Sequence, residues 1–181
     1  MRKVTSGLFI SLDGVVEAPH LWQFDMFDED MEDAMSHLLA GIDTALLGRV
    51  TYQDWAAYWP NATVDNDYAD FINNTPKYVA STTLDHLEWQ NSILIRGPVT
   101  DTVRRLKAEP GGIIGVQGSP TLVRFLLSEG LLDELTLAVH PVIAGGGKRL
   151  FDDMNELKRM DLIDSRITGS GVAILTYAPH R

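Results

Sequence analysis

Two short segments each combine a strand, a glycine and a helix start, and this combination can bind an anion. In the first, an apolar run ends at Gly48, Arg49 follows, and a helical pattern begins near Thr51. A helix start presents backbone N–H groups at the positive end of the helix dipole, glycine lets a ligand approach the backbone, and arginine adds a planar cation suited to phosphate. The alternative is a tight turn at Gly48 beside a solvated Arg49.

The second segment, "IIGVQGSPTLVRFLL" at 113–127, has the same design. Ser119 is a good N-cap and Pro120 suits the first helical position, while Gly115 and Gly118 expose the backbone. Open α/β sheets bind ligands at the carboxyl ends of their strands, so we expect both segments side by side, gripping the diphosphate of a dinucleotide. The G-x-G-x-x-G fingerprint of the ordinary Rossmann cradle is absent.

A third polar cluster follows another short strand, in "VASTTL" at 79–84. The hydroxyls of Ser81, Thr82 and Thr83 could bind a ribose or a 2'-phosphate. The alternative is an ordinary turn, which such clusters commonly form.

Composition excludes several other classes of function. The formal net charge is -10, which argues against nucleic acid and against an acidic membrane surface as partners. The chain has no cysteine, which excludes disulfides and thiolate catalysis, and its five histidines show no metal-ligand spacing. We therefore expect no metal site.

The remaining sequence-level signals point to a cytoplasmic protein. No segment reaches the roughly 20 apolar residues of a membrane span. The apolar patch in "MRKVTSGLFISLDG" is interrupted by Asp13 and is too short for a signal peptide. The length of 181 residues, 45% of them hydrophobic, fits one domain with a sizeable core.

Strand-like runs alternate with helical patterns over most of the chain, and strands dominate its end. The expected strands span 4–12, 44–47, 78–80, 92–95, 113–116, 135–140, 161–168 and 172–178. The expected helices span 27–40, 51–59, 65–74, 100–108 and 120–128, and 13–26 reads as a long loop. This order predicts an α/β fold whose sheet is mostly parallel and ends in an antiparallel C-terminal hairpin turning at 169–171.

These residues also match a known family in their order along the chain. The matching blocks are "SLDG" (11–14), "LLGRVTY" (46–52), "AST" (80–82), "VQGSPTLVRFLL" (116–127) and "PVIAGGGKRLF" (141–151). The chain resembles the dihydrofolate reductase-like superfamily, above all the branch with the C-terminal reductase domain of the riboflavin-biosynthesis deaminase/reductase. The resemblance implies one domain over residues 1–181 with that three-layer fold.

The resemblance implies an NADPH-dependent reductase and assigns cofactor-binding residues by motif. The sequence departs from dihydrofolate reductases at 118–120, where it has Gly-Ser-Pro and they carry Gly-Gly-Arg. One cationic contact to the cofactor is therefore missing. The implied cofactor-binding residues are Leu12, Val16, Gly48, Arg49, Thr51, Ser81, Thr82, Gln117, Gly118, Ser119, Thr121 and Leu122.

Two carboxylates are candidates for the catalytic proton donor. Dihydrofolate reductases grip the pterin ring with a helix carboxylate, and a count without gaps back from Gly48 places that position on Glu32. Asp13 is the rival, because "SLDGVV" borders the nicotinamide in the family. The alternatives are a solvated helix face for Glu32 and a cap of the turn at Gly14 for Asp13.

The implied substrate is a small heterocycle, such as a 5-amino-6-(5-phosphoribosylamino)uracil-like riboflavin precursor or a pterin. Trp22 and Phe24 are the best candidates to contact a planar substrate. The glycine-rich loop at 144–151 lacks P-loop spacing and is expected beside the substrate pocket through Gly146. The alternative function is a non-catalytic nucleotide-binding sensor that retains the fold, and a homodimer is expected in either case.

Overall fold

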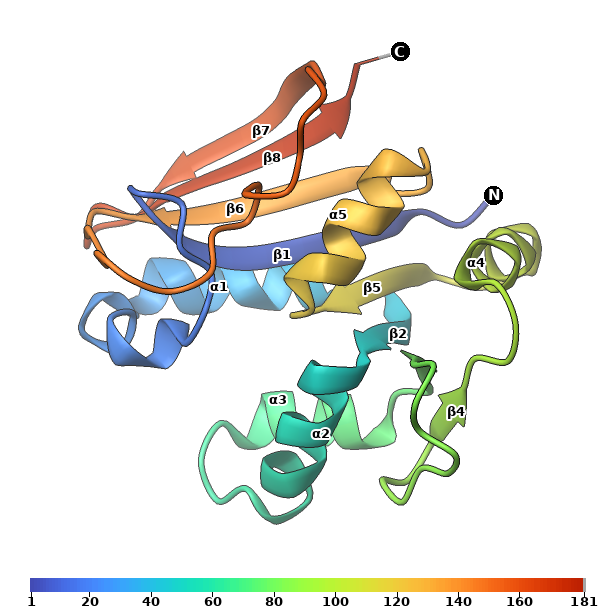
Figure 1. Cartoon of the computed structure of the whole chain (residues 1–181). Coiled ribbons are helices and arrows are strands. Elements are labelled where there is room, and N and C mark those ends of the chain that lie inside the picture. Colours follow the sequence, from blue (N-terminus) through green and yellow to red (C-terminus); the bar gives the residue numbers. More distant parts are fainter. Residues whose placement is uncertain (181) are drawn as a thin grey trace. The chain divides into compact units, whose positions relative to one another are not determined.

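The computed structural model of the protein describes residues 1–180. The chain divides into two compact units, which are described separately (Figure 1). The first unit comprises residues 1–4 and 41–131, and the second comprises residues 5–40 and 132–181. None of the helices found in residues 1–180 is both long and apolar enough to cross a bilayer. A single domain over residues 1–181 stays a prediction.

The strands of the first unit are all parallel to their neighbours. They are β2 (Ile42–Gly48), β3 (Lys77–Ala80), β4 (Ser92–Leu94) and β5 (Ile113–Gln117), in the order β4-β3-β2-β5. In this register Gly48 lies opposite Ala80, and Leu46 lies opposite Val116. The carboxyl ends of β3, β2 and β5 therefore lie next to one another at one edge of the sheet.

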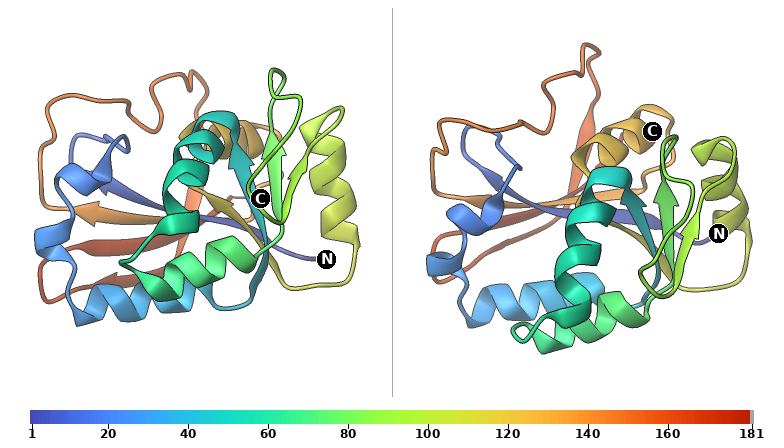
Figure 2. Two further views of the ribbon diagram at one scale, coloured as in Figure 1. Left: turned by 90° about the horizontal axis from the view of Figure 1, so that it is seen from below. Right: turned by 60° about the horizontal axis from the view of Figure 1, so that its bottom comes forward.

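Helices cover both faces of the central strand β2, where residues 44–47 are buried. On one face, α2 (Arg49–Tyr58) and α3 (Asn66–Asn74) pack with β2 and β3 in a core that is rich in aromatic rings. On the other face lies α5 (Pro120–Ser128), and α4 (Val99–Ala108) precedes β5 (Figure 2). Trp55 and Trp59 pack against this core.

A buried lysine joins α3 to β3. Lys77 is 0% exposed, and its Nζ donates to the carbonyl oxygens of Ile72 (2.8 Å) and Thr75 (2.9 Å) at the end of α3. Its ammonium also lies 4.5 Å from the ring centroid of Trp89. The last carbonyls of a helix lack intrahelical donors, so the Lys77 ammonium supplies hydrogen-bond donors and a positive charge at the end of α3.

The second unit holds the antiparallel part of the fold. Its strands are β1 (Val4–Ser11), β6 (Glu134–His140), β7 (Met160–Ile167) and β8 (Ala173–Pro179), in the order β1-β6-β8-β7. β1 and β6 are parallel, whereas β8 runs antiparallel to both β6 and β7. The turn between β7 and β8 uses Gly171 at φ +90°, as the hairpin prediction requires.

The helix α1 (Glu29–Leu39) covers one face of this sheet, with Met31 and Ala34 packed against Ala138 and Ile174. Asp28 caps α1 by accepting the N–H of Met31 at 3.0 Å. This cap determines that the helix begins at Glu29.

The predicted elements are found with small shifts at their ends. Helix α2 begins at Arg49, two residues before the predicted start, so Arg49 is helical. The expected loop at 13–26 contains two short 3₁₀ turns, η1 (Pro19–Leu21) and η2 (Phe24–Met26). A third, η3 (Trp59–Asn61), follows α2.

Replacement of Lys77 by methionine tests the role of the buried ammonium. Lys77→Met keeps the length of the side chain and removes the donor from buried carbonyls, so we expect a loss of about 2–3 kcal/mol in the free energy of unfolding. Urea denaturation followed by circular dichroism measures it. Lys148→Met, at an exposed lysine, is the control; equal losses in the two variants would contradict the role.

Candidate functional site

The two strand–helix junctions are bonded directly to each other through Ser119. The backbone N–H of Gly48 donates to Ser119 Oγ at 2.7 Å, and the N–H of Ser119 donates to Thr51 Oγ1 at 3.1 Å. The junctions after β2 and β5 are therefore side by side, as the sequence predicted. Their helices, α2 and α5, begin at the same edge of the sheet.

This close approach depends on glycine at both junctions. A Cβ on Gly48 would lie 3.2 Å from Ser119 Oγ, and a Cβ on Gly118 would lie 3.1 Å from Thr51 Cγ2. Gly118 and Ser119 both have φ +55°, in the left-handed region. Such a conformation is uncommon outside glycine, and Ser119 adopts it where its backbone N–H donates to Thr51.

Neither helix start is occupied by a capping side chain. Ser119 is at the N-cap position of α5, as predicted, but its hydroxyl accepts from Gly48 and makes no capping hydrogen bond. The N-cap of α2 is Gly48, and Thr51 accepts from Ser119, so Thr51 does not cap α2 either. Two neighbouring helix starts without side-chain caps form a cradle of backbone N–H groups, which is an arrangement that attracts anions.

Arg49 is the cation at this cradle. Its side chain is exposed, and Nη1 donates to Gln53 Oε1 at 2.8 Å, one helical turn along α2. This bond is an exposed pair between residues i and i+4, so it is weak and an anion can compete for the guanidinium.

Three more of the predicted cofactor residues, Ser81, Thr82 and Gln117, follow or end strands of the first unit at the same edge. Ser81 directly follows β3, and its Oγ accepts the N–H groups of Thr83 (3.1 Å) and Leu84 (3.0 Å), which is the turn foreseen as the alternative. The neighbouring Thr82 is exposed. On the other side, Gln117 Oε1 accepts the hydroxyl of Tyr68 at 3.0 Å.

Two more predicted residues lie in the first turn of α5. Thr121 is exposed, and its Oγ1 accepts a hydrogen bond from Arg124 Nη2 at 3.4 Å. The side chain of Leu122 is 7% exposed, so Leu122 can offer a ligand its backbone N–H only.

In the second unit, Asp13 organises the loops after β1 and β6. Its carboxylate accepts the hydroxyl of Ser11 at 2.6 Å and the N–H groups of Ala144 and Gly145, both at 2.9 Å. These hydrogen bonds, that of Ser11 foremost, lower the pKa of Asp13 to about 2. Asp13 is ionised at neutral pH and acts there as an acceptor, and it caps residues 144–145 instead of the turn at Gly14.

The two loops are also joined by backbone hydrogen bonds. The N–H of Leu12 donates to Val142 O at 2.8 Å, and that of Val16 donates to Lys148 O at 3.0 Å. The side chain of Leu12 is exposed and that of Val16 is buried. Gly146 is exposed at the tip of the second loop.

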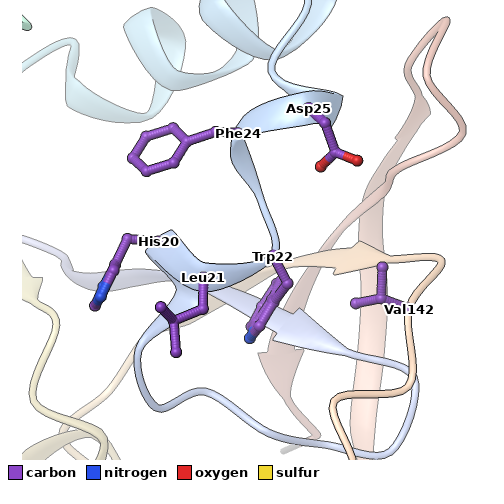
Figure 3. Close-up of a pocket in the computed structure, with 6 residues that line it drawn as sticks. All are labelled: His20, Leu21, Trp22, Phe24, Asp25 and Val142. Carbon is purple, nitrogen blue, oxygen red and sulfur yellow. The ribbon is translucent and has the colours of Figure 1, made fainter.

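An open hollow of about 380 Å³ lies beside η1 and η2, a size typical of small-molecule sites. It includes both predicted substrate-contacting aromatics, Trp22 and Phe24. Gly146 is not among its lining residues in the described part of the chain, and neither is Glu32, which lies exposed on α1 as the solvated-face alternative expects. The lining residues are His20, Leu21, Trp22, Phe24, Asp25 and Val142 (Figure 3).

Sequence reasoning missed four of these lining residues. His20, Leu21 and Asp25 flank the predicted aromatics along the same loop, so nearness in sequence was the available signal. Val142 joins them through the fold, just after β6. No group of His, Asp or Glu suited to a metal ion occurs within residues 1–180.

The model of the RibD C-terminal domain family matches residues 2–174. The chain belongs to this family. It is 30% identical over 179 residues to the uncharacterized protein YyaP of Bacillus subtilis, an alignment that covers 97% of this chain and 94% of YyaP.

Solved structures show the fold of this RibD C-terminal domain. A suggested riboflavin biosynthesis protein from Shewanella sp. PV-4 has TM-score 0.81 at 19% identity, covering 99% of both chains. The deaminase/5-amino-6-(5-phosphoribosylamino)uracil reductase of Thermotoga maritima has TM-score 0.71 at 13% identity, covering 99% of this chain and 57% of that chain. Dihydrofolate reductase from Enterococcus faecalis, complexed with NADP(H), has TM-score 0.63 at 12% identity, covering 99% and 97%.

The predicted fold is therefore confirmed. This RibD C-terminal domain has the dihydrofolate reductase-like fold, with a mostly parallel arrangement of strands and an antiparallel C-terminal hairpin.

The ionised state of Asp13 predicts a pH-dependent stability. Its pKa in the folded protein, about 2, lies below the ordinary 3.8, so the stabilisation is present above pH 3.8 and is lost as the pH falls toward 2. We expect Asp13→Asn to lower the melting temperature at neutral pH, and the difference from the wild type to shrink to nothing across that acid range. Thermal denaturation at several pH values measures it.

The matched control is Asp54→Asn, at an exposed carboxylate on α2. A difference between Asp13→Asn and the wild type that stays constant from neutral pH to pH 2 would show that the carboxylate charge does not hold the loops.

Proposed function

We propose that this protein is an NADPH-dependent reductase of a small heterocyclic substrate. The observation that carries the proposal is the hydrogen-bonded pair of helix starts at Gly48 and Ser119. Membership of the RibD C-terminal domain family supports a reductase-type role. The structural likeness to a dihydrofolate reductase complexed with NADP(H) supports the choice of cofactor.

In the proposed complex, the first turns of α2 and α5 bind the diphosphate of the cofactor through backbone N–H groups. Arg49 adds a charged hydrogen bond, and Ser81 and Thr82 contact the adenosine side. The bound cofactor supplies the hydride, and the protein positions it and excludes water. Leu12 and Val16 are proposed to border the nicotinamide.

The proposed substrate is a pyrimidine resembling 5-amino-6-(5-phosphoribosylamino)uracil, or a pterin. Support comes from the reductase activity named for the Thermotoga maritima neighbour and from the aromatic hollow at Trp22 and Phe24. Apolar walls with a few polar groups are typical of sites for planar ligands.

A non-catalytic nucleotide sensor is the second candidate, and the state of the two carboxylates favours it. Asp13 is ionised and already accepts three hydrogen bonds, while Glu32 is exposed on α1. The pKa of Asp13 is lowered, which is opposite to the shift expected of a proton donor in a protected site. NADPH oxidation followed by absorbance, with pyrimidines, pterins and quinones as substrates, separates the two: tight NADPH binding without turnover would favour the sensor.

Replacement of Arg49 tests the phosphate assignment directly. A charged hydrogen bond contributes about 1.5–3 kcal/mol, so Arg49→Ala should raise the Kd for NADPH by roughly 10- to 150-fold. Arg104→Ala is the control, because Arg104 is exposed on α4 and pairs with Asp101 of the same helix. A change within about twofold in Arg49→Ala would remove Arg49 from the site.

We also propose a homodimer formed through β7. This strand ends the order β1-β6-β8-β7 and exposes Leu162 (54%), Ile163 (51%) and Ile167 (65%). An exposed apolar edge strand invites pairing with another chain, and a second copy would cover it.

Light scattering after size exclusion tests the dimer. The wild type should elute with twice the chain mass, and Leu162→Lys with Ile163→Lys should shift it to the monomer mass. Ile93→Lys is the matched control, because Ile93 is 44% exposed on the other edge strand, β4. A wild type of monomer mass would end this proposal.

A further inference from the structure

Tyr68 of α3 carries a hydroxyl that is bonded to the last residue of β5. The hydroxyl donates to Gln117 Oε1 at 3.0 Å, although 49 residues separate the two in the sequence. Burial raises the pKa of Tyr68, so its hydroxyl stays protonated at neutral pH and is available as a donor. Because Gly118 and Ser119 follow Gln117 directly, this bond is made at the start of the junction between β5 and α5.

Three aromatic neighbours hold the ring of Tyr68 in place. Its centroid lies 5.9 Å from that of Trp55, 4.8 Å from that of Trp59 and 5.7 Å from that of Phe71. Aromatic rings at these spacings pack favourably, and a packed ring has few rotamers available. The hydroxyl is therefore fixed in its direction toward Gln117.

The amide of Gln117 has room in this position because residue 115 is a glycine. Alternate residues of a strand share a face, and a Cβ on Gly115 would lie 2.8 Å from Gln117 Nε2. A side chain at position 115 would thus collide with the amide that Tyr68 holds. Gly115 is buried, so it admits the side chain of Gln117 instead of exposing its backbone to a ligand, as the sequence had suggested.

The next residue along the chain contacts the same aromatic cluster. A Cβ on Gly118 would lie 3.5 Å from Cζ2 of Trp55, so the indole packs beside the backbone of the junction. Gly118 and Ser119 both have φ +55°, and the two hydrogen bonds of Ser119 join the β5–α5 junction to the β2–α2 junction. Gln117 and Gly118 are thus held by aromatic residues of α2 and α3 immediately before the residue that joins the junctions.

We propose that Tyr68 is a positioning residue for the cofactor cradle, and that it acts through Gln117 to fix the left-handed turn at Gly118 and Ser119. The inference rests on the proposed function, because the cradle is where that reductase would bind the diphosphate of its cofactor. Backbone N–H groups that are already aimed at an anion bind it more tightly, since no ordering has to occur on binding. Helix α3, which contains no predicted cofactor residue, then contributes to cofactor affinity.

The first test removes the hydrogen bond from either side. Tyr68→Phe keeps the ring and loses the donor, whereas Gln117→Met keeps a side chain of similar length and loses the acceptor. Each should raise the Kd for NADPH roughly three- to tenfold, measured by calorimetry far below the melting temperature. A tyrosine that only stabilises the fold would lower the melting temperature and leave the Kd of the folded protein unchanged.

Tyr58→Phe is the matched control for Tyr68→Phe. Tyr58 is 49% exposed on α2, and its ring also packs against Trp59, with 4.9 Å between the centroids. This variant should bind NADPH as the wild type does. An unchanged Kd in Tyr68→Phe, or an equal rise in Tyr58→Phe, would overturn the proposal.

The double variant Tyr68→Phe with Gln117→Met shows whether the two residues act through one bond. Both changes remove the same interaction, so the Kd of the double variant should be no higher than that of the weaker-binding single variant. Effects of the two changes that multiply would show independent contributions and would contradict the positioning role.

Hydrogen exchange of the Ser119 amide tests the turn without any cofactor. This N–H donates to Thr51, so its exchange should be several-fold faster in Tyr68→Phe and in Gln117→Met, relative to the amide of the buried Leu106 in α4. Gln117→Met decides this measurement alone if Tyr68→Phe fails to fold, and an unchanged exchange ratio would overturn the inference.

These measurements separate the inference from the proposed function. Faster exchange at Ser119 in the variants of a protein that does not bind NADPH would keep the action of Tyr68 on the turn and end the reductase proposal. NADPH turnover by the wild type, with Kd and exchange both unchanged in Tyr68→Phe, would do the reverse.

Discussion

The two hydrogen bonds of Ser119 are the interaction on which the proposed cofactor site depends. The hydroxyl of Ser119 accepts the N–H of Gly48 at the β2–α2 junction, and the backbone N–H of Ser119 donates to Thr51 in α2. Each junction therefore fixes the position of the other. The left-handed backbone at Ser119 is unfavourable for a residue with a side chain, and these two hydrogen bonds stabilise it. With Ser119 engaged in this way, α5 is left without a capping side chain, so its first-turn N–H groups are not satisfied by a cap.

In the second unit, Asp13 plays a comparable structural role. The carboxylate binds one hydroxyl and two backbone amides, and this holds the loops after β1 and β6 in place. The same bonds keep Asp13 ionised, so a role in loop structure competes with a role as proton donor. Residues that shape a loop and residues that transfer protons need opposite pKa shifts, and here the structural role sets the value.

The aromatic residues differ in how much of their role the sequence reveals. Trp22 and Phe24 could be named from the sequence because aromatic residues in a loop are conspicuous. Tyr68 could not, because a tyrosine within a helical pattern is most often an ordinary packing residue. Its hydrogen bond to Gln117 becomes visible only when the fold brings α3 to the end of β5.

The sequence alone determined the order of the elements, because hydrophobic periodicity, glycines and prolines act over a few residues. It located the strand–glycine–helix junctions at Gly48 and Gly118 and the C-terminal hairpin, and its family motifs indicated the fold. Only the tertiary structure decided what each polar side chain does. Ser119 was expected to cap its own helix and instead accepts a hydrogen bond from Gly48. Asp13 was a candidate proton donor, with a cap of the turn at Gly14 as the alternative, and its carboxylate instead accepts the N–H groups of residues 144 and 145. Hydrogen-bond partners distant in sequence are chosen by strand register and loop packing, which no local pattern of residues encodes.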